Sequence, residues 1–275
     1  MKVIIYTNRN VSIFRSSLQE TVTTVVMSRD VVLVVDPTWL PSEVEEIKTY
    51  VDRIIGQRKL YLLFTHSDFD HIIGYNAFPG AKVIASGAFA KSSLEKQNRI
   101  LSEIKSFDDE FYLTRPYKTA FPKVDHTFKR DGETFKIGDL QLTFYNAPGH
   151  NDDGMFTIIE PLGILLSGDY FCDVEFPYIY YSGELYEKTL AKLDIIMKQI
   201  DIRLMIPGHG NYTTNKQEMK KRQSDSLNYL HFMRKLIKEN DQEAIDHLID
   251  RYKFLTIMKK FHKDNMMLLK KEMEQ

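Results

Sequence analysis

The segment 65–74 constrains this 275-residue chain more than any other, because it places four metal-ligand side chains within six residues. It directly follows an apolar run, 60–64, that has the composition of a strand. Imidazoles and carboxylates suit borderline divalent metals, and a strand end holds such side chains on rigid backbone. The four candidates are His66, Asp68, Asp70 and His71. The segment therefore predicts a metal site at the end of a strand.

The spacing of these four residues favours two ions over one. His66 and Asp68 are two positions apart and point the same way in an extended segment, whereas the adjacent Asp70 and His71 project differently and can serve a second ion. The alternative is a surface turn with solvated aspartates, in which Asp70 caps a helix that begins at Ile72. The ligand chemistry makes the metal site our preferred interpretation.

Three later candidate ligands also stand where an apolar run stops. His150, Asp169 and His209 each follow a glycine-containing turn at such a point. Side chains at strand ends of an open sheet are fixed by the backbone, while the loops give access to them. With the first four, these residues make seven candidate ligands, which argues for a dinuclear site.

Composition excludes several classes of protein. The formal net charge of −1 offers no general attraction to nucleic acid, and no stretch approaches the length of a membrane span. A single cysteine, Cys172, allows no intramolecular disulfide, and polar residues interrupt the apolar run at the N-terminus before a signal peptide could form. We expect a cytoplasmic protein that binds neither nucleic acid nor membrane.

Apolar periodicity predicts a chain in which helices and strands alternate. From residue 215 onward the pattern is helical, so we expect a first domain over residues 1–214 and a C-terminal helical extension over 215–275. A proline- and aromatic-rich segment, 108–129, is long enough to cover a functional site. The predicted strands are 3–6, 21–27, 31–35, 60–64, 82–85, 140–144, 155–160, 163–166 and 203–206, and the predicted helices before residue 215 are 40–58, 88–107 and 184–200, with a short one ending near residue 79.

Several other reactive side chains have more ordinary interpretations. Cys172 lies near Asp169, but a lone cysteine is usually a small apolar filler and is left out of the ligand set. We expect His126 to pack or lie on the surface, and the C-terminal histidines to be solvated. Tyrosines that follow the ligand turns form a pool from which a leaving-group acid could come, although most such tyrosines pack. The histidines are His231, His247 and His262, and the tyrosines are Tyr170, Tyr178, Tyr180, Tyr181 and Tyr212.

The ordered ligand candidates resemble the metallo-β-lactamase superfamily, whose usual motif is His-x-His-x-Asp-His followed by a His, a bridging Asp and a last His. The turn Asp36-Pro37-Thr38 after an early strand fits as well, and the resemblance covers residues 1 to about 211. It implies an α/β fold, the four-layered αβ/βα sandwich of that superfamily, with the site at one edge of the inner sheets. The motif is specific for the fold and weakly specific for the substrate.

The resemblance also implies a role for each ligand. A hydroxide bound between two divalent ions would be the nucleophile, and Asp70 and Asp169 would be the catalytic carboxylates. By the resemblance, the first ion is held by His66, Asp68 and His150, the second by Asp70, His71 and His209, and Asp169 bridges the two.

Asp68 departs from the pattern, because the superfamily usually has His there. Three carboxylates and a hydroxide would cancel the four charges of two divalent ions, so the centre would be less electrophilic. Zn²⁺ is the metal that the superfamily implies, whereas the carboxylate favours Fe²⁺ or Mn²⁺. Flavodiiron proteins similarly place a carboxylate at this position, but they carry a flavodoxin module for which this chain has no room.

We interpret the chain as a metal-dependent hydrolase that cleaves an ester-like bond of a small molecule, namely a thioester, lactone or phosphodiester. One alternative is a di-iron redox or oxygen-binding protein that works with a separate electron donor, and another is a metal-dependent sensor. The C-terminal helices, with their apolar stripes, are candidates for a homodimer contact. The substrate, the metal and the leaving-group acid are open at this point.

Overall fold

The computed structural model describes residues 3–275 and divides the chain into two compact units. The first contains the described residues up to Tyr145 together with Thr157–Pro161, and the second contains Asn146–Phe156 and Leu162–Gln275. The boundary expected between residues 214 and 215 falls inside the second unit. The division into a domain over 1–214 and an extension over 215–275 therefore stays a prediction.

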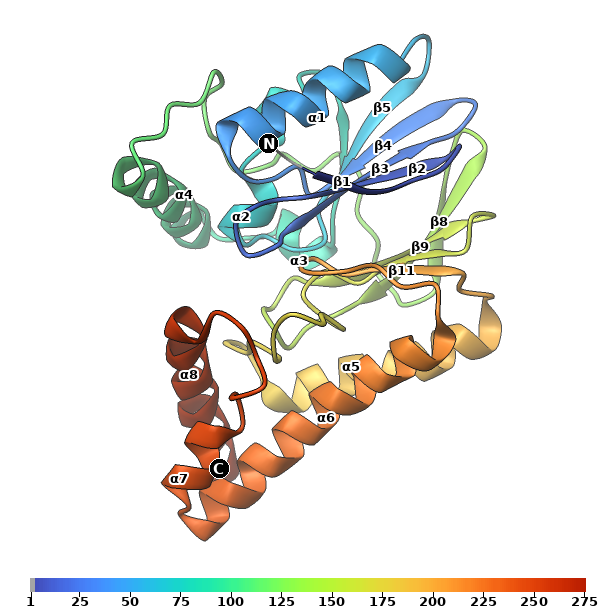
Figure 1. Cartoon of the computed structure of the whole chain (residues 1–275). Helices are drawn as coiled ribbons and strands as arrows, with labels where there is room; N and C mark the ends of the chain where they lie inside the picture. Colours follow the sequence, from blue (N-terminus) through green and yellow to red (C-terminus); the bar gives the residue numbers. More distant parts are fainter. Residues whose placement is uncertain (1–2) are drawn as a thin grey trace. The chain divides into compact units, whose positions relative to one another are not determined.

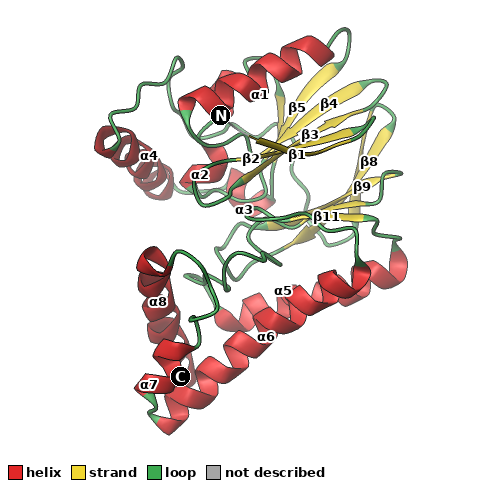
Figure 2. Ribbon diagram, in the orientation of Figure 1, coloured by secondary structure: helices red, strands yellow, loops and turns green. Residues whose placement is uncertain are grey.

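A six-stranded sheet forms the centre of the first unit, with its strands arranged in chain order (Figure 2). The first four strands pair antiparallel, and the fourth, fifth and sixth pair parallel. All five residues of β4 are buried, as expected for a β-branched central strand covered on both faces. The sequence analysis did not predict β2. The strands are β1 (Val3–Thr7), β2 (Val11–Arg15), β3 (Val22–Met27), β4 (Val31–Val35), β5 (Lys59–Leu63) and β6 (Lys82–Ile84).

The parallel pairing of β4 with β5 positions the ligand segment. Val35 lies opposite Leu63, so the chain leaves both strands at the same edge of the sheet. Asp36 follows β4, and its carboxylate accepts a hydrogen bond of 2.9 Å from the backbone N–H of Thr65. The two loops at this edge are therefore joined directly.

The helices of the first unit pack on this sheet or follow its ligand loop (Figure 1). α1 (Pro41–Ile54) buries Val44, Ile47 and Val51 in the core that the sheet provides, and it ends earlier than predicted. The predicted helix over 88–107 is two helices, because Ser93 caps the second by accepting the Lys96 N–H. The remaining helices of the unit are α2 (Phe69–Ile72), the 3₁₀ turn η1 (Tyr75–Ala77), α3 (Gly87–Ala90) and α4 (Leu94–Glu110).

A second sheet has the strand order β11-β10-β9-β8-β7. The antiparallel hairpin of β7 (Glu133–Ile137) and β8 (Leu140–Asn146) belongs to the first unit except for its last residue, while β9 (Met155–Glu160) begins in the second unit and ends in the first. In the second unit β10 (Ile164–Leu166) pairs parallel with β11 (Leu204–Ile206). The turns that follow β10 and β11 therefore leave at one edge, and the Gly208 N–H donates to the Gly168 carbonyl over 2.7 Å.

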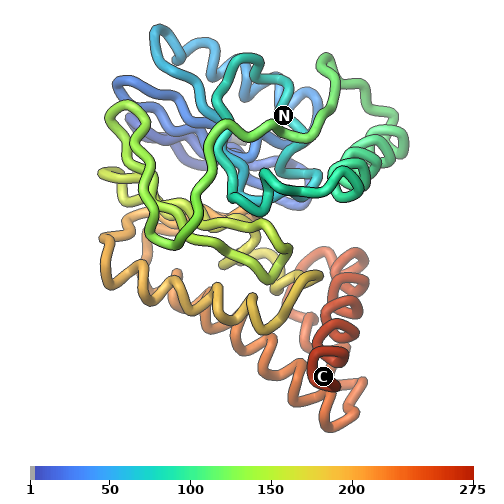
Figure 3. The backbone as a smooth tube through the Cα atoms, turned by 180° about the vertical axis from the view of Figure 1, so that it is seen from behind, coloured from blue at the N-terminus to red at the C-terminus, as the bar shows by residue number. Residues whose placement is uncertain are grey.

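Four helices complete the second unit, and α6 packs against α5, α7 and α8. Figure 3 shows the red end of the chain turning from α6 through α7 into α8. The predicted α/β class with C-terminal helices is confirmed. No helix within residues 3–275 combines the length and the apolar character needed to cross a membrane. The helices are α5 (Gly183–Gln199), α6 (Lys216–Glu239), α7 (Gln242–His247) and α8 (Leu255–Met273).

Candidate metal centre

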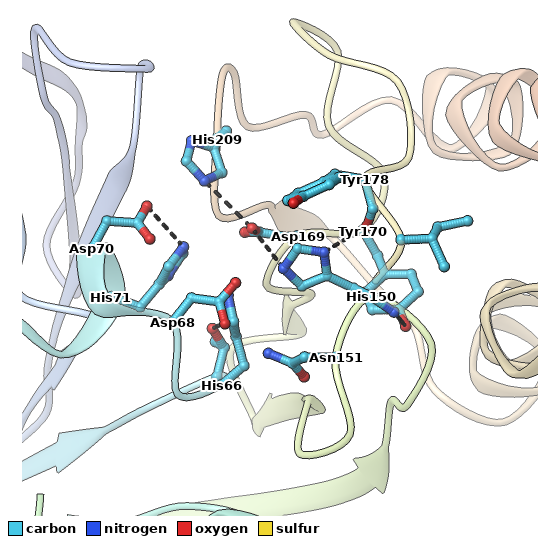
Figure 4. Close-up of polar contacts among 12 residues, drawn as sticks. His66, Asp68, Asp70, His71, His150, Asn151, Asp169, Tyr170, Tyr178 and His209 are labelled. Carbon is cyan, nitrogen blue, oxygen red and sulfur yellow. Dashed lines mark hydrogen bonds and ion pairs between the residues drawn. The ribbon is translucent and has the colours of Figure 1, made fainter. Parts of the chain in front are cut away.

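The four early candidates lie together in the first unit, where the chain leaves β5 and enters α2 (Figure 4). His66 Nε2 is 3.5 Å from an oxygen of Asp68, and His71 Nε2 is 3.5 Å from an oxygen of Asp70. Both imidazoles are buried, and their ring centroids are 4.0 Å apart. The loop thus forms two adjacent imidazole–carboxylate pairs, in the order that the spacing predicted.

The buried carboxylate of Asp36 orients both of these imidazoles. One oxygen accepts the Thr65 N–H, and the other accepts the Thr65 hydroxyl at 2.6 Å and His71 Nδ1 at 3.0 Å. The Thr65 hydroxyl proton is therefore committed to Asp36, so its oxygen accepts from His66 Nδ1, which lies 3.0 Å away. Both histidines carry their proton on Nδ1 and present Nε2 as a lone pair, the form that binds a metal.

The three later candidates lie together in the second unit. Oδ2 of Asp169 is 3.3 Å from His150 Nε2 and 3.5 Å from His209 Nε2 (Figure 4). Both imidazoles are buried, and the Asp169 side chain is 10% exposed. One oxygen of Asp169 thus approaches both imidazoles.

The Nδ1 side of the His150 ring is held by a backbone carbonyl. Its Nδ1 lies 2.6 Å from the carbonyl oxygen of Tyr178, which can only accept, so Nδ1 carries the proton here as well. The Tyr170 hydroxyl accepts the His150 N–H and donates to the Ala147 carbonyl, each over 3.1 Å. Gly149 has φ +136°, and a Cβ there would lie 2.4 Å from the backbone nitrogen of Tyr186, so the turn before His150 requires glycine.

Asn265 of α8 forms hydrogen bonds on both sides of Tyr178, whose carbonyl holds His150. Its fully buried side chain accepts the Ile179 N–H at 2.8 Å and donates to the Pro177 carbonyl at 2.5 Å, on either side of Tyr178. It also donates to the Tyr229 hydroxyl at 3.0 Å, and that hydroxyl lies 2.8 Å from His262 Nδ1. The C-terminal helices are thereby hydrogen-bonded to the segment that orients a candidate ligand.

The spacing of the candidate ligands fits a divalent ion. Nitrogen and oxygen ligands bound at about 2.1 Å in tetrahedral geometry lie about 3.4 Å from one another. The four imidazole–carboxylate pairs are separated by 3.3–3.5 Å. Direct charge-assisted hydrogen bonds would be shorter, about 2.7–2.9 Å. Because Nε2 of His66, His71 and His150 each faces a carboxylate oxygen, the donor atoms within each unit fit a divalent cation.

The other candidates named from the sequence have structural roles. Tyr170 is buried, which raises its pKa well above the usual value, so it positions the His150 turn and does not titrate near neutrality. Burial likewise raises the pKa of the Cys172 thiol. His126 stacks on Phe135 with centroids 3.4 Å apart, and burial lowers its pKa. The expectation that it packs is met.

One expectation about the C-terminal histidines was wrong. His262 is buried, with Nε2 2.8 Å from the Ile245 carbonyl and Nδ1 facing the Tyr229 hydroxyl, because it lies on the inward stripe of α8. His231 and His247 are exposed, and His247 pairs with Asp250.

Two residues at the centre were missed as functional side chains. Asp36 was recognised only as part of a turn, although its position directly after a strand was a usable signal. Glu175 was not considered at all, yet a carboxylate oxygen of Glu175 lies within 4.8 Å of ligand atoms of both Asp169 and His209. Glu175 stands in an irregular segment with no spacing pattern to mark it.

Comparison with known proteins gives one family and many similar folds. A family model described as "Metallo-beta-lactamase superfamily" matches residues 18–209. The chain is 26% identical over 168 residues to the acyl-coenzyme A thioesterase MBLAC2 of Gallus gallus, a match that spans 57% of this chain and 58% of that protein. The chain thus spans little more than half the length of this relative.

Solved structures show the same fold at low identity. A metallo-β-lactamase family protein from Thermus thermophilus has a TM-score of 0.63 at 17% identity, covering 95% of this chain and 92% of that one. An archaeal superfamily protein from Sulfolobus tokodaii has a TM-score of 0.58 at 17% identity, covering 98% of this chain and 100% of that one. These likenesses establish the fold that the order of the ligands predicted.

Proposed function

Because the chain belongs to the metallo-β-lactamase superfamily, we propose that it is a metallo-hydrolase that cleaves an ester-like bond of a small molecule with two divalent metal ions. The observation that supports this most is the tautomer of three imidazoles. His66, His71 and His150 each commit the Nδ1 proton to an acceptor, which leaves Nε2 to face a carboxylate. Such preorganised lone pairs suit metal binding.

We assign the ligands to the two ions in the order that the superfamily implies. His66, Asp68 and His150 would hold the first ion, Asp70, His71 and His209 the second, and Asp169 would bridge them. The approach of one Asp169 oxygen to both His150 and His209 supports the bridging role. Each carboxylate would offset part of the positive charge and fix the separation of the ions.

Two such ions supply Lewis acidity that makes water a nucleophile near neutral pH and polarises the substrate oxygen. The protein's part is to fix the ligands and leave one side open. The Asp68 side chain is 24% exposed, against 0% for His71 and 2% for His66. Substrate would therefore approach on the side of Asp68, where a carboxylate in place of the usual imidazole lowers the net positive charge.

Among ester-like bonds we propose a thioester as the first candidate, because the similar protein from Gallus gallus is an acyl-coenzyme A thioesterase. Lactones and phosphodiesters are the other classes to compare. Zn²⁺ is the metal typical of the superfamily, and Asp68 supports Fe²⁺ or Mn²⁺. A cytoplasmic location and a homodimer through the C-terminal helices complete the proposal, the latter supported by the exposed Phe232 and Met267.

The test is metal analysis of protein purified without added metal, followed by turnover of an acyl-coenzyme A thioester, a lactone and a phosphodiester. We expect about two ions per chain and hydrolysis of at least one substrate. Asp169→Ala should lower both metal content and turnover more than loss of any terminal ligand. At most one ion after reconstitution with Zn²⁺, Mn²⁺ or Fe²⁺ would refute the dinuclear centre. Bound iron with electron transfer and no hydrolysis would favour the di-iron redox alternative.

A further inference from the structure

We propose that Glu175 is an additional ligand of this centre, bound through its carboxylate to the ion that His209 and Asp169 would share. The inference rests on the proposed function and extends it to a residue outside the superfamily's usual ligand pattern. A carboxylate oxygen of Glu175, one of Asp169 and an imidazole nitrogen of His209 all lie within 4.8 Å of one another. Three donor atoms of three residue types thus converge within the second unit.

Hydrogen bonds fix the chain just before Glu175. The Asp173 carboxylate accepts the Asn211 N–H at 2.9 Å and the Asn211 side-chain amide at 3.0 Å, and pairs with Arg222 at 3.3 Å. Gly210 has φ +87°, and a Cβ there would lie 2.2 Å from an Asp173 oxygen, so only glycine permits this approach. The segment containing Glu175 is thereby tied to the turn that presents His209.

Aromatic packing fixes the chain just after Glu175. Phe176 is 3% exposed and stacks on Tyr229 of α6, with centroids 5.0 Å apart. Its ring also meets Tyr252 and His262 edge-on, at 5.4 and 5.6 Å. Glu175 is therefore a half-buried side chain on a backbone that is anchored on both sides, the arrangement expected of a preorganised ligand.

The charges also support a cation between Glu175 and Asp169. The Glu175 and Asp169 carboxylates, with oxygens within 4.8 Å of each other, repel one another, and a cation bound between them would offset that repulsion. Two divalent ions bring four positive charges, of which Asp68, Asp70 and Asp169 offset three. Glu175 would be a fourth carboxylate of the centre, and the added oxygen ligand favours the harder ions Mn²⁺ and Fe²⁺ over Zn²⁺.

The test compares wild type with Glu175→Gln in metal binding. Affinities for Mn²⁺ and Zn²⁺ are measured by competition with a chromophoric chelator, and the coordination of Co²⁺ is followed by its visible absorption. We expect the Mn²⁺ affinity of the weaker site to fall by about tenfold or more, with a smaller loss for Zn²⁺. The Co²⁺ absorption should become stronger as the coordination number falls. Glu175→Asp should lie between the two proteins.

Glu184→Gln is the matched control, since it removes one carboxylate from an exposed position of α5 where Glu184 pairs with Lys188. Its metal affinities and Co²⁺ spectrum should equal those of wild type. A Glu175→Gln protein that binds two ions with unchanged Mn²⁺ affinity and an unchanged spectrum would overturn the assignment of Glu175 alone. A wild-type protein that binds fewer than two ions would overturn the proposed function, whatever the variant does.

Discussion

The candidate ligands of the two units are held by different kinds of support. In the first unit a charged side chain, Asp36, orients His66 and His71 from the end of a core strand. In the second unit a neutral backbone carbonyl, that of Tyr178, orients His150, and Asn265 of α8 holds the peptide groups on either side. The first support lies within the matched family region, residues 18–209, and Asn265 lies beyond it.

This difference shows that a side chain inside the matched family region can depend on structure outside that region. A carboxylate acceptor makes an imidazole more basic and can be removed by one substitution. A carbonyl acceptor cannot be removed by changing its own side chain, so its position depends on whatever fixes the backbone. For His150 that is a buried amide on a helix more than a hundred residues later in the chain. Substitutions of Asp36 and of Asn265 distinguish orientation by a side chain from orientation by the backbone.

The largest effect is expected from Asp36→Asn. Asp36 has φ +46°, which asparagine tolerates, so the change acts on hydrogen bonding rather than on the backbone. The amide places a donor where Thr65 or His71 requires an acceptor. Metal affinity, measured by chelator competition, should fall by about 10- to 100-fold.

Asp52→Asn is the control for this change, because Asp52 is an exposed carboxylate of α1 that pairs with Lys48. Its metal affinity should match that of wild type. If Asp36→Asn binds metal as tightly as the control does, Asp36 does not determine the tautomer and orientation of His66 and His71.

Asn265→Ala should have the next largest effect. It frees the peptide groups beside Tyr178 and leaves buried groups without a partner, each costing about 1–3 kcal/mol of unfolding free energy. Because the His150 acceptor is then less well fixed, the affinity for one of the two ions should fall by about tenfold. Denaturant unfolding and metal titration, done on the same preparations, measure the two effects.

Tyr229→Phe separates stability from orientation. It removes a hydroxyl that contacts both Asn265 and His262 but keeps the bonds of Asn265 to the 177–179 segment. Stability should fall while metal affinity stays at the wild-type value. Equal losses of affinity in the two variants would mean that α8 acts only through general stability.

The smallest effect concerns His262. Burial is the main cause that lowers its pKa, opposed by the Ile245 carbonyl and by Asp246. Above the unfolded value of about 6.5 the histidine is neutral in both states and its contribution to stability is complete. As the pH falls below that value, the unfolded chain takes up a proton that the folded chain resists, so the unfolding free energy drops by at most about 1.4 kcal/mol per pH unit.

Urea unfolding between about pH 7.5 and 5 measures this slope. His262→Gln retains a side-chain donor but does not titrate, so its stability should vary less with pH than that of wild type. The same slope in both proteins would show that other groups cause the acid sensitivity.

Four of the candidate positions were predictable because each follows the end of a strand by three or four residues, namely His66, His150, Asp169 and His209. Parallel pairing of β4 with β5, and of β10 with β11, brings such ends to one edge, so apolar runs and the turns after them locate the side chains. Whether all seven bind metal remains a prediction. The sequence analysis did not predict the short strand β2 or the division of one predicted helix at Ser93, because a few polar residues interrupt the apolar pattern there.

The residues that orient the candidate ligands were harder to predict, because they act through contacts between distant parts of the chain. Asn265 bonds to residues 86 and 88 positions earlier, a relation that no local pattern contains. A weaker signal was present. Met258, His262, Asn265 and Leu269 fall on one helical stripe and are all buried, so the two polar members had to find partners inside the protein. Interpreting polar residues on an apolar stripe as solvated was the error.

The hydrogen bonds that Asn265 makes on either side of Tyr178 also indicate which positions can change during evolution. The ring of Tyr178 stacks on Phe261, but the group that holds His150 is the carbonyl, which every amino acid possesses. Sequence at position 178 is thus free to vary in any way that preserves apolar contact, while the distant position 265 accepts only a side chain that can both donate and accept. Proximity to the metal ligands is therefore a poor guide to mutational tolerance in this protein.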